Sequence, residues 1–379
     1  MKVLTVFGTR PEAIKMAPLV KELAKHPNIE AKVCVTAQHR EMLDQVLDLF
    51  QIIPDYDLNI MKTNQTLQGI TTEILHQMTG VLEEFKPDYV LVHGDTSTTF
   101  SASLAAFYQK INVAHIEAGL RTYDLYSPWP EEGNRCLTGV LSKLHFSPTE
   151  TTYQNLIREG VPADRIHITG NTVIDALLDV VQLLNTTEHK TKMEAQFPFT
   201  QNSQPMVLVT AHRRENHGQG ILNIAKAVKE LSTIYPNIQY VLPMHLNPKV
   251  RSIFIEELKE ISNVYLIEPQ EYLPFVYLMS KSMFILSDSG GVQEEAPSLG
   301  KPVLVMRDTT ERPEAVAAGT VKLVGADQKN IIEHCRRLIE DEEFYKKMAT
   351  AKNPYGDGTA SKKIVQLLFS SLQMVKEVA

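Results

Sequence analysis

The chain has 379 residues, a formal net charge of −7, and 43% hydrophobic and 22% charged residues. This composition is typical of a globular protein, and the length exceeds that of one ordinary hydrophobic core, so two domains are expected. The 38 basic residues are scattered along the chain, which argues against the basic stripe that nucleic-acid binding requires.

Apolar runs in the sequence are short. None approaches the roughly 18 apolar residues of a membrane span, and the first apolar run is too short for a secretory signal. The cysteines, Cys34, Cys136 and Cys335, show no metal-ligand spacing and are interpreted as reduced thiols. We therefore expect a cytoplasmic protein without a membrane partner.

In the first half, short β-branched runs alternate with longer amphipathic segments, which predicts a parallel sheet covered by helices. The predicted strands are 3–7, 31–37, 89–94, 113–117, 144–148 and 165–170. A polar stretch rich in turn formers follows at 185–204 and is the predicted domain boundary.

The first predicted strand ends in Gly8-Thr9-Arg10-Pro11-Glu12. Proline suits the first helical position, so Arg10 and Lys15 are expected near a helix N-terminus, where a diphosphate binds well. For Lys15 alone, a solvated first turn is the simpler explanation. The position of Arg10 between strand and helix favours anion binding.

Two later strands each end in a carboxylate, Asp95 in HGDTSTT and Glu117 in HIEAGLR. Acid–base chemistry on a sugar needs such groups, one to take a proton and one to give it. Asp95 is equally well explained as a helix N-cap. Glu117 ends an apolar strand, where a charge is costly unless it is used.

The segment SPWPEEGNR at 127–135 contains the only tryptophan. Its prolines and glycine predict a rigid loop that holds Glu131, Glu132 and Arg135 in place. A rigid loop that presents an acid is one way to orient a general base, so Glu131 is a predicted catalytic residue. A surface charge remains a plausible reading of Glu132.

After residue 204 the strand pattern restarts, with predicted strands at 206–212, 238–245, 263–269, 282–291, 301–307 and 319–325. We therefore predict an α/β protein with two doubly wound domains, 1–185 and 205–359. A helix at 360–379 is expected to pack back on the first domain. Ligands of such sheets lie beyond the carboxyl ends of the strands, so the expected site is a cleft between the two domains.

Chemistry in the second half is predicted at two places. His212 ends a strand beside Arg213 and Arg214, which favours contact with an anionic ligand over a structural histidine. The turn Ser289-Gly290-Gly291 lets the backbone approach a phosphate closely. Glycine at an ordinary strand–turn–helix would explain this turn by itself.

Three charged residues close to this turn favour a nucleotide-sugar site. Glu294 and Glu295 are expected to accept hydrogen bonds from a sugar diol, and Arg312 is expected to balance a diphosphate. The sequence has no GxGxxG after its first strand, no Walker A motif and no HExxH. No nicotinamide cofactor and no metal are therefore expected.

Taken in order, GTRPEAIKMAP, TAQHREML, VHGDT, EAGLR, SPWPEEGNR, TGNTVIDAL, HRREN, PQEYLPF, DSGGVQEEAPSLGKPVLVMRDTTERPEA and NPYGDG resemble one family across essentially the whole chain. It is the bacterial non-hydrolysing UDP-N-acetylglucosamine 2-epimerases. The likeness is greatest to members that feed enterobacterial common antigen synthesis. It implies a GT-B fold of two Rossmann-like domains and a homodimer.

The resemblance also implies the site. Residues implicated in catalysis are Asp95, Glu117, Glu131 and His212. Substrate and UDP contacts fall on Arg10, Lys15, Asp95, Glu117, Arg135, His212, Gln270, Phe275, Ser289, Gly290, Gly291, Glu295 and Arg312. Family members bind a second substrate molecule as an allosteric activator, and Gln38 and His39 are the expected contacts.

The implied reaction is the interconversion of UDP-N-acetylglucosamine and UDP-N-acetylmannosamine. UDP leaves C1 as the C2 proton is removed, which gives a 2-acetamidoglucal, and UDP then adds back with protonation from the other face. Three alternatives stay open: a GT-B glycosyltransferase using a UDP-sugar, a hydrolysing epimerase, and a UDP-sugar sensor without turnover.

Overall fold

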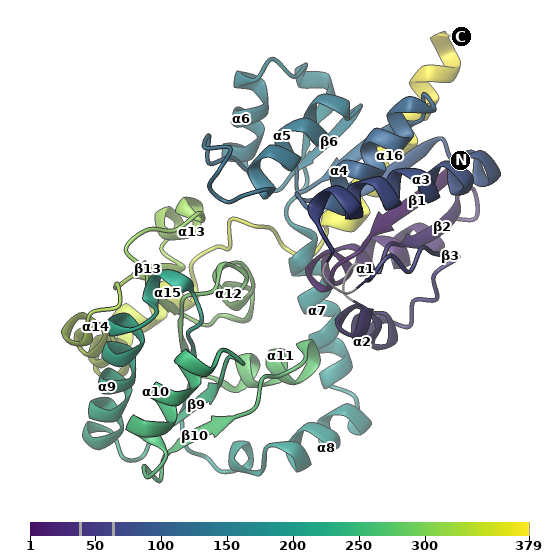
Figure 1. Ribbon diagram of the computed structural model, residues 1–379. Helices are drawn as coiled ribbons and strands as arrows, with labels where there is room; N and C mark the ends of the chain where they lie inside the picture. Colours follow the sequence, from purple (N-terminus) through teal and green to yellow (C-terminus); the bar gives the residue numbers. More distant parts are fainter. Residues whose placement is uncertain (38–39, 63–64, 379) are drawn as a thin grey trace. The chain divides into compact units, whose positions relative to one another are not determined.

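The computed structural model describes residues 1–37, 40–62 and 65–378, with the backbone alone for 372–378. The chain forms two compact units (Figure 1). Unit 1 comprises Met1–Ala176 and Tyr355–Ala379, and unit 2 comprises Leu177–Pro354. The polar stretch at 185–204 contains α8 and the 3-10 helix η2 and lies inside unit 2.

In the described part of unit 1, seven parallel strands form one sheet in the order β3-β2-β1-β4-β5-β6-β7. The strands are β1 (Lys2–Phe7), β2 (Glu30–Val35), β3 (Tyr56–Asp57), β4 (Tyr89–His93), β5 (Asn112–Ile116), β6 (Leu144–Ser147) and β7 (Ile166–Ile168). Each predicted strand of this half is present. Only the two-residue β3 was not predicted, because so short a segment shows no periodicity.

The helices of unit 1 follow the strands in alternation. They are α1 (Arg10–Ala24), α2 (Arg40–Phe50), α3 (Leu67–Phe85), α4 (Ser97–Tyr108), α5 (Glu131–Leu141), α6 (Glu150–Arg158), the 3-10 helix η1 (Ala163–Arg165), the first residues of α7 (Thr172–Leu184), and α16 (Ala360–Val378). Figure 1 shows the yellow α16 among the purple and blue elements of unit 1, and α16 packs against α1.

Unit 2 contains the second parallel sheet, in the order β10-β9-β8-β11-β12-β13. Its strands are β8 (Met206–Thr210), β9 (Gln239–Pro243), β10 (Val264–Ile267), β11 (Phe284–Ser287), β12 (Val303–Val305) and β13 (Val321–Leu323). All of them coincide with predicted strands.

The helices of unit 2 also alternate with its strands. After α7 they are α8 (Thr187–Gln196), η2 (Pro198–Gln201), η3 (Arg214–Asn216), α9 (Gln219–Ile234), α10 (Pro248–Leu258), α11 (Tyr272–Lys281), α12 (Gly290–Glu295), η4 (Ala296–Leu299), α13 (Pro313–Ala318), α14 (Gln328–Glu340) and α15 (Glu342–Ala349). The predicted α/β class with two Rossmann-like units is confirmed.

Burial explains why the strands are apolar along their whole length. All five residues of β4, YVLVH, are buried, as are the four residues of β11, FILS. Parallel sheets are covered by helices on both faces, so both faces of a central strand need apolar side chains. Each unit accordingly has its own core, around Val90 and Val92 in unit 1 and around Leu286 and Leu304 in unit 2.

The strand order places several predicted site residues at the switch points of the two sheets. In unit 1 the order reverses between the neighbours β1 and β4, and in unit 2 between β8 and β11. Doubly wound sheets bind ligands beyond the carboxyl ends of the strands at such switch points. The turns that follow these four strands contain Arg10, Asp95, His212 and Ser289.

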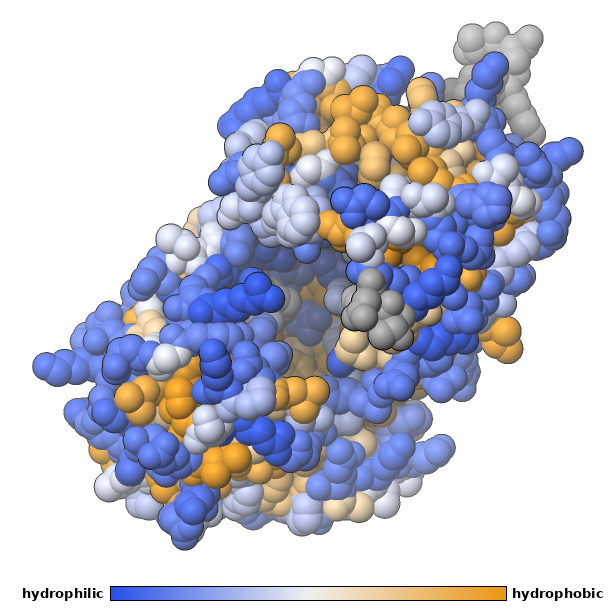
Figure 2. Space-filling model, in the orientation of Figure 1, coloured by the Kyte–Doolittle hydropathy of each residue, from blue (hydrophilic) through white to orange (hydrophobic). Residues whose placement is uncertain are grey.

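Apolar side chains are exposed on the neighbouring helices α4 and α5 of unit 1. Phe107 and Tyr108 of α4 are 53% and 69% exposed, and Leu137 and Val140 of α5 are 51% and 83% exposed. Figure 2 shows hydrophobic residues gathered over this part of unit 1. No helix in the described ranges is long and apolar enough to span a membrane.

Candidate functional site

Helix α1 begins where proline predicted it. Thr9 is the N-cap with extended backbone, and Pro11 lies in the first turn. Glu12 completes a capping box and is buried, where its carboxylate accepts hydrogen bonds from the backbone N–H of Gly8 (3.0 Å) and Thr9 (2.8 Å). Burial raises the pKa of Glu12 despite these bonds. The turn that carries Arg10 is therefore fixed from within.

The turn after β4 excludes one of the two readings of Asp95. The N-cap of α4 is Thr96, whose side chain accepts from the backbone N–H of Thr99 at 3.1 Å. Asp95 is therefore no helix cap. Its carboxylate instead accepts a hydrogen bond from Arg135 at 2.5 Å, and its backbone oxygen accepts one from Asn134 at 3.0 Å.

Glu117 lies at the end of β5 in an unusual backbone conformation. Its φ is +61°, in the left-handed region that glycine adopts readily and that other residues rarely occupy. Such conformations persist where the surrounding structure holds them, and they cluster at functional sites. The residue is 6% exposed, so its charge is buried.

Several donors surround the Glu117 carboxylate. Lys15 of α1 forms an ion pair with Oε1, and Asn171 donates to the same oxygen at 3.1 Å. Arg135 of α5 donates to Oε2 at 3.3 Å and also to the Glu117 backbone oxygen. Lys15 is therefore not merely a solvated residue of a first turn, and Arg135 joins the two predicted strand-end carboxylates.

These partners decide the ionisation of the cluster. Burial by itself would raise the pKa of Glu117, but the positive charges of Lys15 and Arg135 hold it well below its usual range. His93 of β4 lies 3.9 Å from Glu117 Oε1, and burial lowers its pKa to about 4. At neutral pH Glu117 is thus a carboxylate beside a neutral imidazole.

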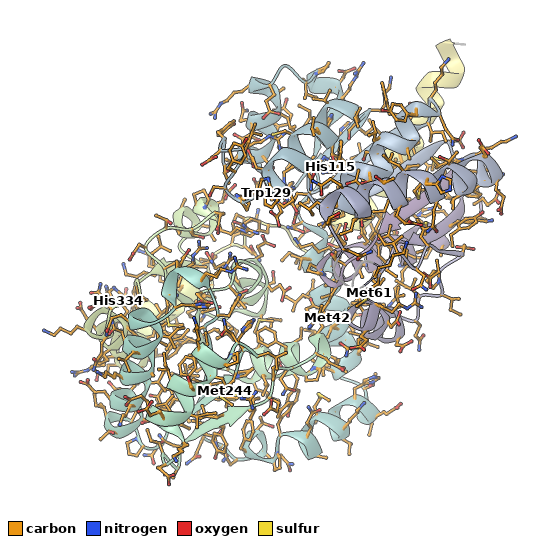
Figure 3. The ribbon with its side chains drawn as sticks, in the orientation of Figure 1. Met42, Met61, His115, Trp129, Met244 and His334 are labelled. Carbon is orange, nitrogen blue, oxygen red and sulfur yellow. The ribbon has the colours of Figure 1, made fainter. Side chains whose placement is uncertain are left out.

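Glu131 and Glu132 begin α5 rather than lying in a loop. Glu132 is 4% exposed and accepts from the backbone N–H of Tyr123 at 3.0 Å, so its reading as a surface charge is wrong. Glu131 Oε2 is buried with no hydrogen-bond partner among the described residues. Trp129, just before this helix, is 61% exposed (Figure 3). Burying a carboxylate oxygen without a hydrogen-bond donor costs folding free energy. Such an oxygen is expected where the carboxylate acts on a ligand.

His115 explains part of the rigidity beneath these groups. It lies on β5 (Figure 3), and its Nε2 is 2.7 Å from the backbone oxygen of Gly94. Burial lowers the pKa of His115 well below its ordinary value, so the ring is neutral and donates here. The Gly94 turn, with φ +70°, is thereby tied to the neighbouring strand.

In unit 2, Asp288 organises the turn that contains His212. The backbone N–H groups of His212 and Arg213 donate to its carboxylate at 2.9 Å, and Asn216 donates at 3.1 Å. His212 Nδ1 lies 3.0 Å from Oδ1 of Asp288. Burial raises the pKa of Asp288, but the contacts with His212 and Arg213 outweigh this and bring that pKa below its usual value.

Two guanidinium groups flank the glycine turn after β11. A Cβ at Gly290 would lie 3.5 Å from Cζ of Arg312 and 3.6 Å from Nη2 of Arg213. Arg312 also donates to Glu294 at 2.6 Å. Glu294 is 1% exposed and orients Arg312 through this bond, and its predicted contact with a sugar diol stays a prediction. The predicted anion site beside Ser289 thus contains positive charge.

A second ion-pair cluster of unit 2 is centred on Arg307. Arg307 binds Glu215 at 2.5 Å and Glu311 at 2.6 Å, and so connects η3 with the segment that leads to Arg312. Burial raises the pKa of Glu311, but its bonds to Arg307 outweigh this and lower it to about 2.

The remaining predicted residues lie around α11 and α12. Gln270 precedes α11 and donates to the backbone oxygen of Glu268 at 2.6 Å, while Phe275 is a partly buried residue of α11. Glu295 is 7% exposed, and its Oε1 lies 3.5 Å from the Tyr272 hydroxyl. Gln38 and His39, the expected allosteric contacts, lie outside the described residues.

Sequence reasoning missed two buried partners of site residues. Asp288 directly follows an apolar strand, which is the same signal that identified Glu117. Asn171 lies in TGNTVIDAL, just after a predicted strand, but an asparagine at a turn is so common that this position alone indicates nothing.

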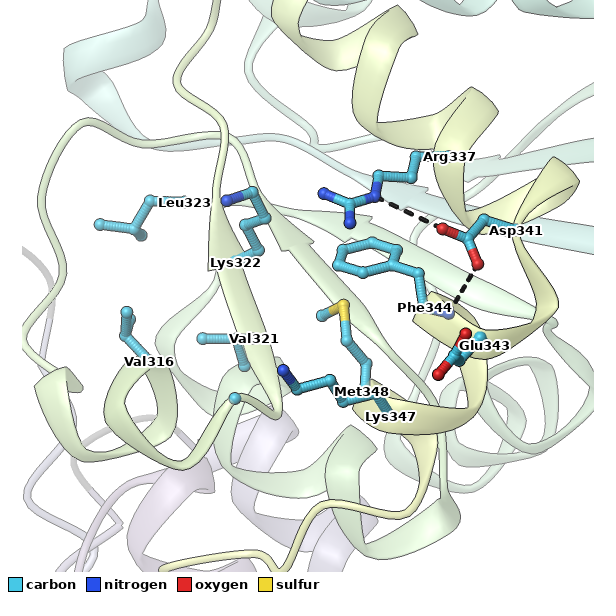
Figure 4. A pocket seen from close by; sticks show the side chains of 11 residues that line it. Val316, Val321, Lys322, Leu323, Arg337, Asp341, Glu343, Phe344, Lys347 and Met348 are labelled. Carbon is cyan, nitrogen blue, oxygen red and sulfur yellow. Dashed lines mark hydrogen bonds and ion pairs between the residues drawn. The ribbon is translucent and has the colours of Figure 1, made fainter.

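A separate pocket of about 670 Å³ opens on unit 2 beside β13, α14 and α15 (Figure 4). Arg337 lies over the Phe344 ring there, 4.0 Å from its centroid, and 3.7 Å from Asp341. Lys322 and Lys347 also line it. None of the predicted site residues lines this pocket, so it is not part of the candidate site.

The chain is similar to known proteins over nearly its whole length. A family model described as UDP-N-acetylglucosamine 2-epimerase matches residues 21–369. The chain is 66% identical to the UDP-N-acetylglucosamine 2-epimerase of Neisseria meningitidis, over 98% of this chain and 100% of that protein. It is 62% identical to the protein of the same name from Escherichia coli K12, over 97% and 98%.

Solved structures agree. The UDP-GlcNAc 2-epimerase of Neisseria meningitidis bound to UDP-GlcNAc matches with a TM-score of 0.90 and 66% identity, over 98% of this chain and 100% of that one. A Methanocaldococcus jannaschii UDP-GlcNAc 2-epimerase in complex with UDP-GlcNAc and UDP matches with a TM-score of 0.80 and 35% identity, over the same shares of the two chains.

Proposed function

The chain belongs to the family of UDP-N-acetylglucosamine 2-epimerases, and from this premise we propose how its residues perform the reaction. The substrate is UDP-N-acetylglucosamine and the product is UDP-N-acetylmannosamine, which differ only in the configuration at C2. The enzyme is an isomerase. The observation that carries the residue assignments is the cluster of Asp95, Glu117, Lys15 and Arg135 at the switch point of unit 1.

The chemistry at C2 decides what the site must supply. No carbonyl is adjacent to C2, so its proton cannot be lost by simple enolisation. The leaving group at C1 offers another route. The C2–H proton passes to a base while the C1–O bond breaks, which gives 2-acetamidoglucal and UDP. UDP then adds back to C1 as C2 takes a proton on the opposite face.

Proton transfer is assigned to the carboxylates of unit 1. A base must take the proton from one face and an acid must return one to the other, so more than one group is needed. Asp95, Glu117 and Glu131 share this work. The unpartnered oxygen of Glu131 and the partly exposed carboxylate of Asp95 support direct contact with substrate.

UDP has to stay bound throughout, because it is both leaving group and nucleophile. Anionic phosphates bind well to arginine, lysine and backbone N–H groups. We assign UDP and substrate binding to the remaining predicted residues: Arg10, Lys15, Arg135, His212, Gln270, Phe275, Ser289, Gly290, Gly291, Glu295 and Arg312. The arginines beside Gly290 and the anchored His212 turn support this assignment.

The reaction as written balances without an oxidant or a metal, so we propose that the enzyme needs no cofactor. Cys34, Cys136 and Cys335 are free thiols, which supports a reducing, cytoplasmic location. The product would supply N-acetylmannosamine units to a cell-surface polysaccharide. The enterobacterial common antigen pathway and allosteric activation by the substrate remain predictions.

We further propose a homodimer. Large apolar residues exposed together usually mark an interaction surface, and Phe107, Tyr108, Leu137 and Val140 form such a group on α4 and α5.

The product of the purified enzyme tests the proposal. UDP-N-acetylglucosamine is supplied with a metal chelator and without nicotinamide or acceptor, and the mixture is followed by proton NMR. We expect UDP-N-acetylmannosamine, and the same equilibrium mixture from either sugar. Free N-acetylmannosamine would indicate a hydrolysing epimerase. Turnover only with an added acceptor would indicate a glycosyltransferase, and binding without turnover a sensor.

A further inference from the structure

Two segments of unit 1 that are far apart in sequence meet at Asn171, which contacts Glu117. The first is the turn between β7 and α7, which contains Gly170 and Asn171. The second is the return segment, which we define as residues 355–358, where the chain re-enters unit 1. The backbone N–H of Asn171 donates to the backbone oxygen of Tyr355 at 2.7 Å.

Close backbone packing fixes this contact. Gly170 has φ +88°, and a Cβ there would lie 3.1 Å from the Tyr355 oxygen and 3.4 Å from Cα of Gly356. A side chain at Gly170 would therefore be strained and would push the return segment away. The first turn of α16 is tied to the same place, because Asp175 accepts from the backbone N–H of Ser361 at 2.8 Å.

The side chain of Asn171 has two separate contacts. Its Oδ1 accepts from the backbone N–H of Val173 at 3.1 Å, the contact of an N-cap at the start of α7. Its Nδ2 donates to Glu117 Oε1 at 3.1 Å. Because the oxygen is committed to a donor, the amide can face the carboxylate only with its NH₂ end. Asn171 is 3% exposed, so water does not compete for it.

We infer that Asn171 is a positioning residue for the epimerase reaction: its amide fixes the rotation of the Glu117 carboxylate, and its own position is fixed by the return segment. The inference rests on the proposed role of Glu117. Lys15 approaches Oε1 on a long flexible side chain, whereas the oxygen of the asparagine amide is held by the backbone N–H of Val173 and the main chain of Asn171 is held by Tyr355. A catalytic base needs a fixed orientation as well as the correct ionisation state.

A cap alone would explain an asparagine at this position, so the test must separate the two contacts. Asn171→Ser retains an N-cap side chain but is too short to reach Glu117, and it adds no charge. Asn171→Asp also retains the cap, but removes the donor and places a second carboxylate beside Glu117. Asn171→Ala removes both contacts.

We expect kcat of Asn171→Ser to fall roughly 10- to 100-fold, the effect of losing a hydrogen bond to a charged group. KM and the Kd for UDP should stay near those of the wild type, and the melting temperature should fall less than in Asn171→Ala, which also loses the cap. Asn171→Ala should lose as much kcat and also stability. A kcat of Asn171→Ser within about twofold of wild type would refute the inference, since a cap-only role predicts that result.

The pH dependence of kcat gives an independent reading. The groups that face Glu117 are Lys15, Arg135 and the neutral His93, besides Asn171. In Asn171→Asp a second acid joins them, and a proton held between the two carboxylates is favoured. The acid limb of the kcat profile should therefore move to higher pH. An unshifted profile would contradict the contact between the two side chains.

The return segment is tested by a matched pair of glycines. Gly170→Ala and Gly160→Ala both force alanine into the left-handed region, at φ +88° and +82°. Nothing lies within 4 Å of a Cβ at Gly160, whereas at Gly170 it meets Tyr355 and Gly356. We expect kcat to fall in Gly170→Ala only; stability should fall in both variants because of the left-handed backbone, and further in Gly170→Ala because of the contact with the return segment. Equal kcat values would refute the dependence on the return segment.

Failure of this inference is distinguishable from failure of the proposed function. If Glu117→Gln turns over normally, the role assigned to Glu117 is wrong, whatever the Asn171 variants do. If Glu117→Gln is severely impaired while Asn171→Ser is normal, only the inference about Asn171 fails.

Discussion

Replacing Glu117 with glutamine removes one buried charge and keeps the shape of the side chain. The carboxylate is 5% exposed and lies between Lys15 and Arg135. A positioned acid–base group contributes about 100- to 10,000-fold to rate, so kcat should fall by that factor, about 3 to 5 kcal/mol in activation free energy. UDP affinity should not fall, because a carboxylate does not attract phosphate and the arginines beside Gly290 are untouched.

The same substitution also affects folding. Breaking a buried ion pair costs about 3 to 5 kcal/mol, and the lower end applies here because Arg135 keeps its bond to Asp95. The melting temperature should therefore fall by roughly 6 to 12 °C for a unit of this size. Activity is to be measured well below the new transition, with folding checked by circular dichroism.

Exchange of the C2 proton, followed by NMR, measures turnover, and calorimetry measures UDP binding. Glu159→Gln is the matched control, because it breaks a bond to the buried Arg121 in the same unit without touching Asp95 or Glu117. Turnover of Glu117→Gln within about tenfold of wild type would refute an acid–base role for this residue.

Three further perturbations follow from the geometry. Asp288→Asn should weaken UDP binding roughly 10- to 100-fold, because it removes the negative charge and one of the two acceptor oxygens that hold the His212 turn; an unchanged Kd in calorimetry would count against that anchor. Glu311→Gln should cost about 1 kcal/mol of unfolding free energy at neutral pH, discounted because the side chain is 40% exposed. The pKa of Glu311 is about 2 in the folded protein and 4.5 ordinarily, so this contribution is complete above pH 4.5 and disappears as the pH falls towards 2. Denaturant curves of variant and wild type that differ equally at neutral pH and near pH 2 would contradict it. Val140→Glu should give a monomer in light scattering if α4 and α5 form the dimer interface, whereas Ile53→Glu, at a residue 90% exposed on another segment, should not change the mass.

The fold was predictable because its main signal is local. Strands covered on both faces are apolar along their whole length, and every predicted strand is found. The unit boundaries were less accessible. The chain leaves unit 1 between Ala176 and Leu177, inside α7, where an amphipathic helix continues without any change of composition.

Some residues of the candidate site could likewise be predicted from local sequence, and others could not. Asp95 and Glu117 were found because a carboxylate that ends an apolar strand is conspicuous in sequence. Whether Asp95 caps a helix depends on Thr96 taking that role, and only the structure decides it.

Their partners are defined by tertiary contacts. Asn171 is 54 positions from Glu117 in sequence, and Asp288 is 76 from His212. Short patterns contain no information about such pairs. The surface reading of the buried Glu132 was wrong for the same reason.

The most direct test of the central claim is the reaction in deuterated water. UDP-N-acetylglucosamine is incubated with the enzyme, and the UDP-N-acetylmannosamine formed is isolated and examined by proton NMR and mass spectrometry. Removal of the C2 proton by a side chain and its return from the opposite face predict one deuterium at C2 of the product. Product that retains its original C2 hydrogen would contradict proton transfer by Asp95, Glu117 and Glu131.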